Sequence, residues 1–88
     1  RGCSQNNLGY VYEQGWGVNR DLQKAMDWYR KAAAQGFAHA QWNLGRMHDE
    51  GIGIPRNESA AIEYYRQAAR AGHQEARKAL EKKGLRWD

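Results

Sequence analysis

Three pairs of side chains suited to binding a polypeptide recur at a fixed interval along this chain. The members of each pair are four residues apart and successive pairs are 36 residues apart: Asn6 and Tyr10, Trp42 and Arg46, Lys78 and Lys82. Residues four apart share one face of an α-helix, so the middle pair would present an aromatic ring beside a fork of guanidinium donors. Tryptophan, tyrosine and arginine are also enriched among the residues that dominate binding energy at interfaces. The pattern predicts a row that binds an extended acidic segment or a terminal carboxylate.

A second interpretation of the same residues is purely structural. Trp42 would pack against its neighbouring repeat, and Lys78 and Lys82 would only be solvated. Asn7 and Asn43 recur at the same interval of 36 residues, and we favour a structural hydrogen bond for them over a contact with peptide backbone. The sequence leaves both interpretations of the row open.

No arrangement typical of catalysis or metal binding is present in the sequence. His39, His48 and His73 are far apart and make no close-spaced ligand pair. The glycines of segment 15–17 follow a helical pattern and not a strand, so they do not form a phosphate-binding loop. No serine or cysteine has a plausible base beside it. We therefore expect no enzyme, no cofactor and no metal.

Composition narrows the class of partner. The 88 residues carry a net charge of +4 that is spread along the chain, whereas nucleic-acid binding usually requires a basic stripe. The composition therefore argues against a nucleic-acid partner.

The sequence also bears on membrane insertion and disulfides. No apolar run approaches the roughly 18 residues of a membrane helix, so we expect a soluble protein with no membrane insertion. A single cysteine, Cys3, allows no intramolecular disulfide. The compartment stays undetermined, because a cytoplasmic and an exported protein both fit.

The elements that must position the row come from an internal repeat. Residues 1–36 and 37–72 are identical at 13 of 36 ungapped positions, and several mismatches, such as Val18 with Ile54 and Trp28 with Tyr64, are conservative. A fixed period of this length is typical of helical arrays. The sequence therefore predicts one repeat domain over residues 1–88, with repeats at 3–36 and 37–72.

Helical spacing and stop signals predict two antiparallel helices in each repeat. In the first repeat they cover 4–14 and the segment from the N-cap Asp21 to about residue 35. In the second they cover 38–50 and 58–71, with Asn57 as the N-cap. Glycines after the helices supply the left-handed stops. Residues 74–83 are predicted to form a charged capping helix, and 84–88 a frayed tail.

Mid-helix glycines at Gly9 and Gly45 indicate a close approach of the second helix of each repeat, since glycine in a helix costs roughly 1 kcal/mol relative to alanine. The small pairs at 32–33 and 68–69 are expected at that contact. Large side chains are expected to fill the space around it: Leu8, Tyr12, Trp28 and Tyr29.

Many positions recur together, and they carry a resemblance. The pattern is Gln-x-Asn-Leu-Gly, then Gly-x-Gly-Val/Ile, then Ala-x-x-Trp/Tyr-Tyr-Arg-x-Ala-Ala-x-x-Gly. It resembles the Sel1-like repeat, a relative of the tetratricopeptide repeat, over residues 3–72 with a partial third copy to about 80. The resemblance implies an all-α solenoid, or superhelix, that scaffolds or recruits other proteins. It implies no particular partner.

In such arrays the first helices of the repeats line a concave surface. With Leu8, Gly9 and Tyr12 turned toward the second helix, the opposite face is expected to carry the predicted row, together with Glu13 and its equivalent Asp49. The leading hypothesis is therefore an adaptor that binds a protein segment on this face. The alternative is an assembly element that self-associates or stacks on upstream repeats through an open N-terminal end.

Overall fold

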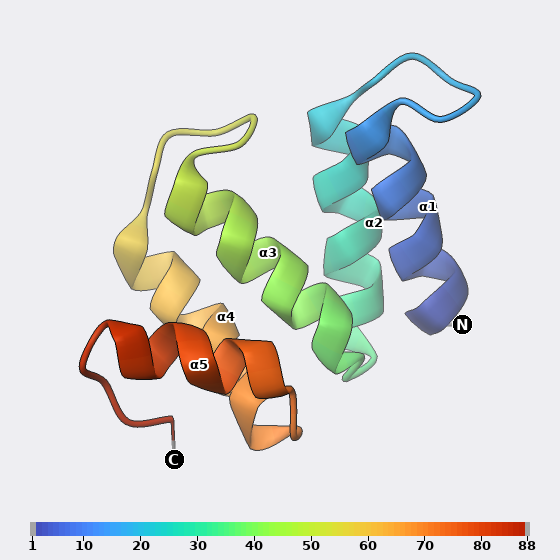
Figure 1. The fold of residues 1–88 in the computed structure, drawn as a ribbon. Coiled ribbons are helices and arrows are strands. Elements are labelled where there is room, and N and C mark those ends of the chain that lie inside the picture. Colours follow the sequence, from blue (N-terminus) through green and yellow to red (C-terminus); the bar gives the residue numbers. More distant parts are fainter. Residues whose placement is uncertain (1, 88) are drawn as a thin grey trace.

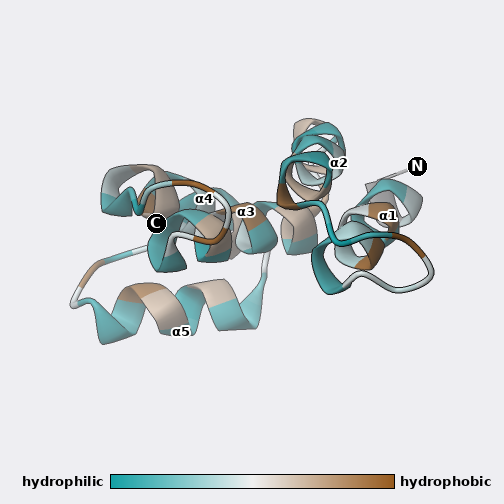
Figure 2. Ribbon diagram, turned by 90° about the horizontal axis from the view of Figure 1, so that it is seen from above, coloured by the Kyte–Doolittle hydropathy of each residue, from teal (hydrophilic) through white to brown (hydrophobic). Residues whose placement is uncertain are grey.

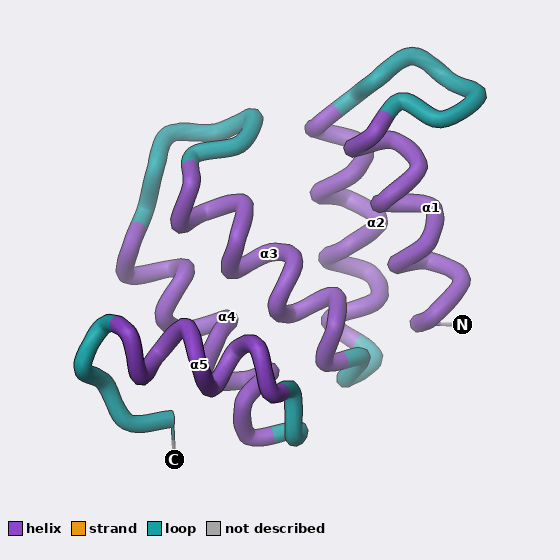
Figure 3. The backbone as a smooth tube through the Cα atoms, viewed as in Figure 1, coloured by secondary structure: helices purple, strands orange, loops and turns teal. Residues whose placement is uncertain are grey.

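The computed structural model describes residues 2–87, which form five α-helices and no strand (Figures 1 and 3). The helices are α1 (Gly2–Gln14), α2 (Leu22–Ala34), α3 (Ala38–Glu50), α4 (Glu58–Arg70) and α5 (Gln74–Lys82). Each predicted helix is present, and its ends lie within two residues of those expected. The all-α prediction is confirmed.

Local chemistry at the helix ends explains these bounds. Asp21 accepts a hydrogen bond from the Lys24 amide at 3.1 Å, and Asn57 accepts one from the Ala60 amide at the same distance. Such side chains satisfy the amides that the first helical turn leaves without partners. At the C-terminal end of α3, Gly51 has a φ of 68°, a left-handed conformation that glycine adopts without steric cost. Both predicted N-caps are confirmed.

The helices form two antiparallel pairs, α1 with α2 and α3 with α4, and α5 packs on α4. Helix α3 also contacts α2 and α1, which joins the two pairs. Figure 2 shows α2 and α4 on one side of the array, while α1, α3 and α5 follow the other side. The first helices therefore form a common surface, and the candidate site lies on it.

Each mid-helix glycine faces an aromatic ring of the following helix. A Cβ atom at Gly45 would lie 2.6 Å from the Tyr65 ring, and one at Gly9 would lie 2.7 Å from the Tyr29 ring. The predicted close approach is thus present. The nearest atoms belong to the tyrosine rings and to the carbonyls of Ala25 and Ala61, and the alanine pairs at 32–33 and 68–69 are not among the three nearest.

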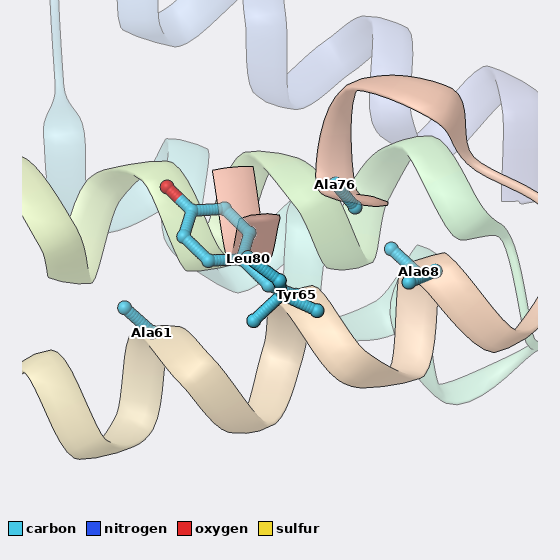
Figure 4. Close-up of a cluster of buried hydrophobic side chains, with 6 residues drawn as sticks. Ala61, Tyr65, Ala68, Ala76 and Leu80 are labelled. Atoms are coloured by element: carbon cyan, nitrogen blue, oxygen red, sulfur yellow. The ribbon is translucent and has the colours of Figure 1, made fainter. Parts of the chain in front are cut away.

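Two apolar clusters hold the array together. One lies between α2 and α3 and includes Met26, Tyr29, Leu44 and Met47. The other joins α4 and α5 around Tyr65 and Leu80, with alanines that let the helices approach (Figure 4). Each cluster crosses a boundary between repeat units, so neither repeat completes its core alone.

The C-terminal segment, for which the sequence predicts a frayed tail, contacts the second cluster. Leu85 and Trp87 pack on the α4–α5 cluster. The Arg77 guanidinium lies 3.9 Å from the centroid of the Trp87 ring, and Arg66 donates to the Arg86 carbonyl at 3.1 Å. Residue 88 lies outside the described residues.

Candidate functional site

The surface formed by α1, α3 and α5 contains two adjoining hollows. We call them the α1–α3 hollow, of about 620 Å³, and the α3–α5 hollow, of about 450 Å³. Asn6 and Tyr10 line the first, and Lys78 and Lys82 line the second. The middle pair of the predicted row, Trp42 and Arg46, lines both hollows. The helices therefore bring all six residues of the predicted row onto one continuous surface.

The first residue of the row has little surface to offer a ligand. Asn6 is only 6% exposed, and its Oδ1 accepts a 2.9 Å hydrogen bond from Nδ2 of Asn43. Leu8 was expected to point inward but is 40% exposed, so that expectation was wrong, whereas Gly9 faces α2 and Tyr12 packs on the α2–α3 cluster as expected. Because α1 packs against α3, the face of α1 that carries Asn6 forms part of the contact between the two repeats.

Arg46 is held in an ion pair inside the array. Its Nη2 donates to Glu13 Oε1 at 2.8 Å and lies 3.4 Å from Asn43 Oδ1. Glu13 is 5% exposed and also accepts a 2.7 Å hydrogen bond from the Tyr29 hydroxyl. Burial by itself would lower the pKa of Arg46, but the hydrogen bond to Glu13 and the charge of Glu13 outweigh this effect, so the pKa of Arg46 is raised. The Arg46 charge is thus already compensated by Glu13, which was expected on the open face.

A matching ion pair joins the second repeat to the end of the chain. Asp49, the equivalent of Glu13, accepts from the Tyr65 hydroxyl at 3.2 Å and from Lys83 Nζ at 3.0 Å. A shift of 36 residues from Arg46 points to Lys82, yet the neighbouring Lys83 fills this role. Helix α5 ends at Lys82, and the turn at its end brings the next side chain to Asp49.

Burial and the neighbouring carboxylate hold both tyrosine hydroxyls in their neutral form. Desolvation is the largest cause of the raised pKa of Tyr29 and of Tyr65, and Glu13 and Asp49 add to it. Each hydroxyl can therefore act as a hydrogen-bond donor to its carboxylate throughout the physiological range. The recurring tyrosine, carboxylate and cation stabilise contacts between units.

Trp42 packs against its neighbouring unit and is also partly open to the two hollows. It is half-buried, packs on the α4–α5 cluster, and stacks on His39 and His73 at centroid distances of 5.5 and 5.4 Å. The same side chain lines both hollows. Replacing Trp42 would therefore disturb the fold as well as the surface.

The sequence analysis did not anticipate the contact between two histidines beside Trp42. His39 Nδ1 and His73 Nε2 are 3.1 Å apart, and His73 Nδ1 accepts a 3.2 Å hydrogen bond from the Ala76 amide. Because Nδ1 of His73 is an acceptor, its Nε2 carries the proton and donates to His39. No known sequence pattern predicts that two histidines 34 residues apart will be in contact. Among residues 2–87 no group of three or more potential metal ligands converges.

Comparison with known proteins identifies the family. The sequence model of the Sel1 repeat matches residues 4–37 and 38–73. The chain belongs to the Sel1 repeat family. The resemblance found in the sequence is thereby confirmed, as is the solenoid architecture.

Solved structures of other Sel1 proteins are similar over nearly the whole chain. A Sel1 repeat protein from Oxalobacter formigenes is 42% identical with a TM-score of 0.89, over 91% of this chain and 32% of that one. The protective antigen c5321 of uropathogenic Escherichia coli is 36% identical with a TM-score of 0.89, over 100% and 20% of the two chains. Helicobacter pylori cysteine rich protein B is 33% identical with a TM-score of 0.85, over 90% and 59%.

A curated relative is a Sel1-like repeat-containing protein of Acanthamoeba polyphaga mimivirus. It is 49% identical over 39 residues, which are 44% of this chain and 7% of the viral protein. The chain thus spans less than two thirds of the length of each of these relatives. Repeats of the Sel1 family are non-catalytic scaffolds that bind other proteins. Within residues 2–87 no helix has the length and apolarity needed to cross a membrane.

The charges left free on this Sel1 surface lie around α5. Lys78 and Lys82 are exposed and have no ion-pair partner among the described residues. Glu50 and Glu75 are exposed as well and line the same α3–α5 hollow. Cations and carboxylates are therefore both available there, whereas Arg46 and Lys83 are already paired.

Acidification is expected to loosen the Sel1 array near its histidines. Burial, followed by repulsion from Arg30, lowers the pKa of His48, and burial followed by His39 lowers that of His73, although Glu75 opposes the second shift. A histidine whose pKa is lower in the folded state than its unfolded value near 6.5 favours folding in its neutral form, and this contribution to stability is fully present above pH 6.5. The contribution is lost as the pH falls from 6.5 toward the folded-state pKa.

The measurement is a series of urea unfolding midpoints between pH 7.5 and pH 5. We expect the midpoint to fall with pH in the wild type and to fall less in His73→Asn. Asparagine is a strong N-cap that does not titrate, so it preserves the hydrogen bond to Ala76. Equal pH profiles for the two proteins would show that His73 does not contribute to acid sensitivity.

Proposed function

We propose that this Sel1 array is an adaptor that binds an extended segment of another protein across its two hollows. The observation that carries the proposal is their continuity through Trp42, whose aromatic surface is shared by both. An amphipathic ring at the centre of a concave surface is a typical anchor for a bound polypeptide. Tyr10, at 40% exposure, supplies a second aromatic contact in the α1–α3 hollow.

In this proposal the partner's acidic residues are recognised by Lys78 and Lys82. These lysines lie one helical turn apart on α5 and are unpaired, whereas the Arg46 charge is held by Glu13. Glu50 and Glu75 line the same hollow and would repel a uniformly acidic segment. We therefore favour a segment with one or two carboxylates facing α5 and uncharged or aromatic residues facing Trp42 and Tyr10.

Selection from a library of random displayed peptides tests this proposal. Wild-type protein is expected to enrich peptides that contain carboxylates. Lys78→Glu combined with Lys82→Glu should weaken the selected peptides by at least about tenfold, because like charges then face each other. The matched control is Lys24→Glu with Arg30→Glu, which makes the same change in net charge at two exposed sites on α2.

Equal losses in the two double variants would indicate a nonspecific charge effect and would overturn the assignment to α5. No loss in either would place recognition elsewhere. Arg46→Glu is unsuitable for this test, because it would set a second carboxylate against the buried Glu13 and disturb the fold. Circular dichroism confirms that each variant used is folded.

A further inference from the structure

One acidic side chain lies where the two hollows meet. Three residues line both the α1–α3 hollow and the α3–α5 hollow: Trp42, Arg46 and Glu75. The charge of Arg46 is already compensated by Glu13, whose Oε1 lies 2.8 Å from Arg46 Nη2. Glu75 is exposed, and its carboxylate makes no ion pair or hydrogen bond within residues 2–87. The free charge at this junction is therefore negative.

The groups nearest to Glu75 along the chain leave its charge uncompensated. Lys78 lies one helical turn further along α5 but forms no ion pair with it in the described part of the chain. Burial, followed by the neighbouring His39, lowers the pKa of His73 and outweighs the opposing effect of Glu75, so that the His73 ring is neutral at pH 7. A cation from outside the array can therefore serve as the partner of Glu75.

The position of Glu75 in the first turn of α5 offers a purely structural explanation, but the other helices argue against it. A carboxylate at a helix start is stabilised by the helix dipole. The array does not require one there, because the equivalent helices α1 and α3 have no acidic residue in their first turns. The residue equivalent to Glu75 on α3 is His39. Helix formation alone therefore does not account for a carboxylate at this junction.

Free charge varies across this surface in a definite order. The α1–α3 hollow is lined by the aromatic side chains of Tyr10 and Phe37 and by amide groups. The carboxylate of Glu75 follows at the junction, and the ammonium groups of Lys78 and Lys82 lie further along α5 in the α3–α5 hollow. A complementary segment has uncharged, cationic and acidic residues in the same order.

We propose that the bound segment carries a lysine or arginine that pairs with Glu75, between the uncharged residues that face Tyr10 and the carboxylates that face α5. This inference rests on the proposed adaptor function and adds a second charge requirement to it. Trp42 lines the same junction, and an aromatic ring beside a cation attracts it. Glu75 thereby selects against segments that are uniformly acidic.

Two pools of synthetic peptides test this inference by fluorescence anisotropy. Every peptide contains, in order, an aromatic residue, a variable residue and a pair of glutamates, joined by short serine spacers of varied length. The variable residue is lysine in one pool and glutamine in the other. Wild-type protein should bind the lysine pool at least about threefold more tightly. Its net charge of +4 by itself favours the more acidic glutamine pool, so overall charge does not produce this preference.

Variants of the protein locate the cation. Glu75→Gln should abolish the preference for lysine, and Glu75→Asp, which keeps the charge, should retain it. The matched control is Glu50→Gln, which makes the same change in net charge at an exposed residue that lines the α3–α5 hollow and not the α1–α3 hollow. This control should retain the preference as well. A preference that survives Glu75→Gln, or that falls equally in Glu50→Gln, would overturn the inference.

The same experiment separates this inference from the adaptor function. Equal binding of the two pools by the wild type would overturn the inference alone, provided that Lys78→Glu combined with Lys82→Glu weakens the binding of both pools. If the wild type binds neither pool, the adaptor function and the inference both fail. Circular dichroism verifies the fold of each variant.

Discussion

Replacement of Glu13 by alanine is expected to destabilise the protein by about 3 kcal/mol. Removing one partner of a buried ion pair costs roughly 3–5 kcal/mol, because the other charge stays behind without compensation. Arg46 retains 19% side-chain exposure, so its charge would be partly solvated and the expected cost lies at the lower end. The Tyr29 hydroxyl would lose its acceptor as well. Urea unfolding followed by circular dichroism measures the change.

The equivalent substitution, Asp49→Ala, is the informative control and is expected to cost only about 1 kcal/mol. Asp49 is 22% exposed, its hydrogen bond from Tyr65 is longer, and Lys83 keeps Glu58 as a partner at 2.9 Å. Glu13→Gln should fall between the two, because glutamine keeps an acceptor for Tyr29 and loses the charge that Arg46 needs. Equal costs for Glu13→Ala and Asp49→Ala would contradict this account.

The second large effect concerns two leucines at the same position of successive repeats. Leu44→Ala is expected to destabilise the protein by about 3 kcal/mol, as is typical when a fully buried leucine leaves a cavity. Leu8→Ala should cost less than about 1 kcal/mol, because Leu8 already has 40% of its surface in water. Single domains have total stabilities of only about 5–15 kcal/mol, so Leu44→Ala would remove a large fraction.

Urea unfolding with an unchanged dependence on denaturant would show that stability alone has changed. Similar losses for the two leucines would contradict the exposed position of Leu8. Sedimentation of the Leu8→Ala variant at the same concentration would then show whether self-association covers α1.

Much of the candidate site followed from sequence periodicity. The offsets of four and 36 residues placed Trp42, Arg46, Lys78 and Lys82 on neighbouring helices, and the structure brings them to one surface. The sequence did not predict which residues pair with these four side chains. Arg46 pairs with Glu13 across two repeats, and the repeat pattern does not say which cation reaches which carboxylate. The choice of Lys83 over Lys82 depends on the turn that ends α5.

The pairing of His39 with His73 shows the same limit. Each histidine lies at the start of a helix in its own unit, and neither has a local sequence feature that points to the other. Their 3.1 Å contact results from the way α5 packs across α4 next to α3. Helix packing angles depend on side chains from several elements at once, so such pairs appear only when the helices are assembled.

The sequence by itself determined the helices, their ends and the period of the array. These features depend on residues a few positions apart, such as Asp21 and Asn57 at N-caps, and on self-similarity at 36 residues. Only the tertiary structure decided which of several equivalent residues are buried, paired or free. Leu8 and Leu44 occupy the same repeat position, yet one is exposed and the other is buried. The physical reason is that burial in an array is set by the neighbouring unit, and that unit differs along the chain.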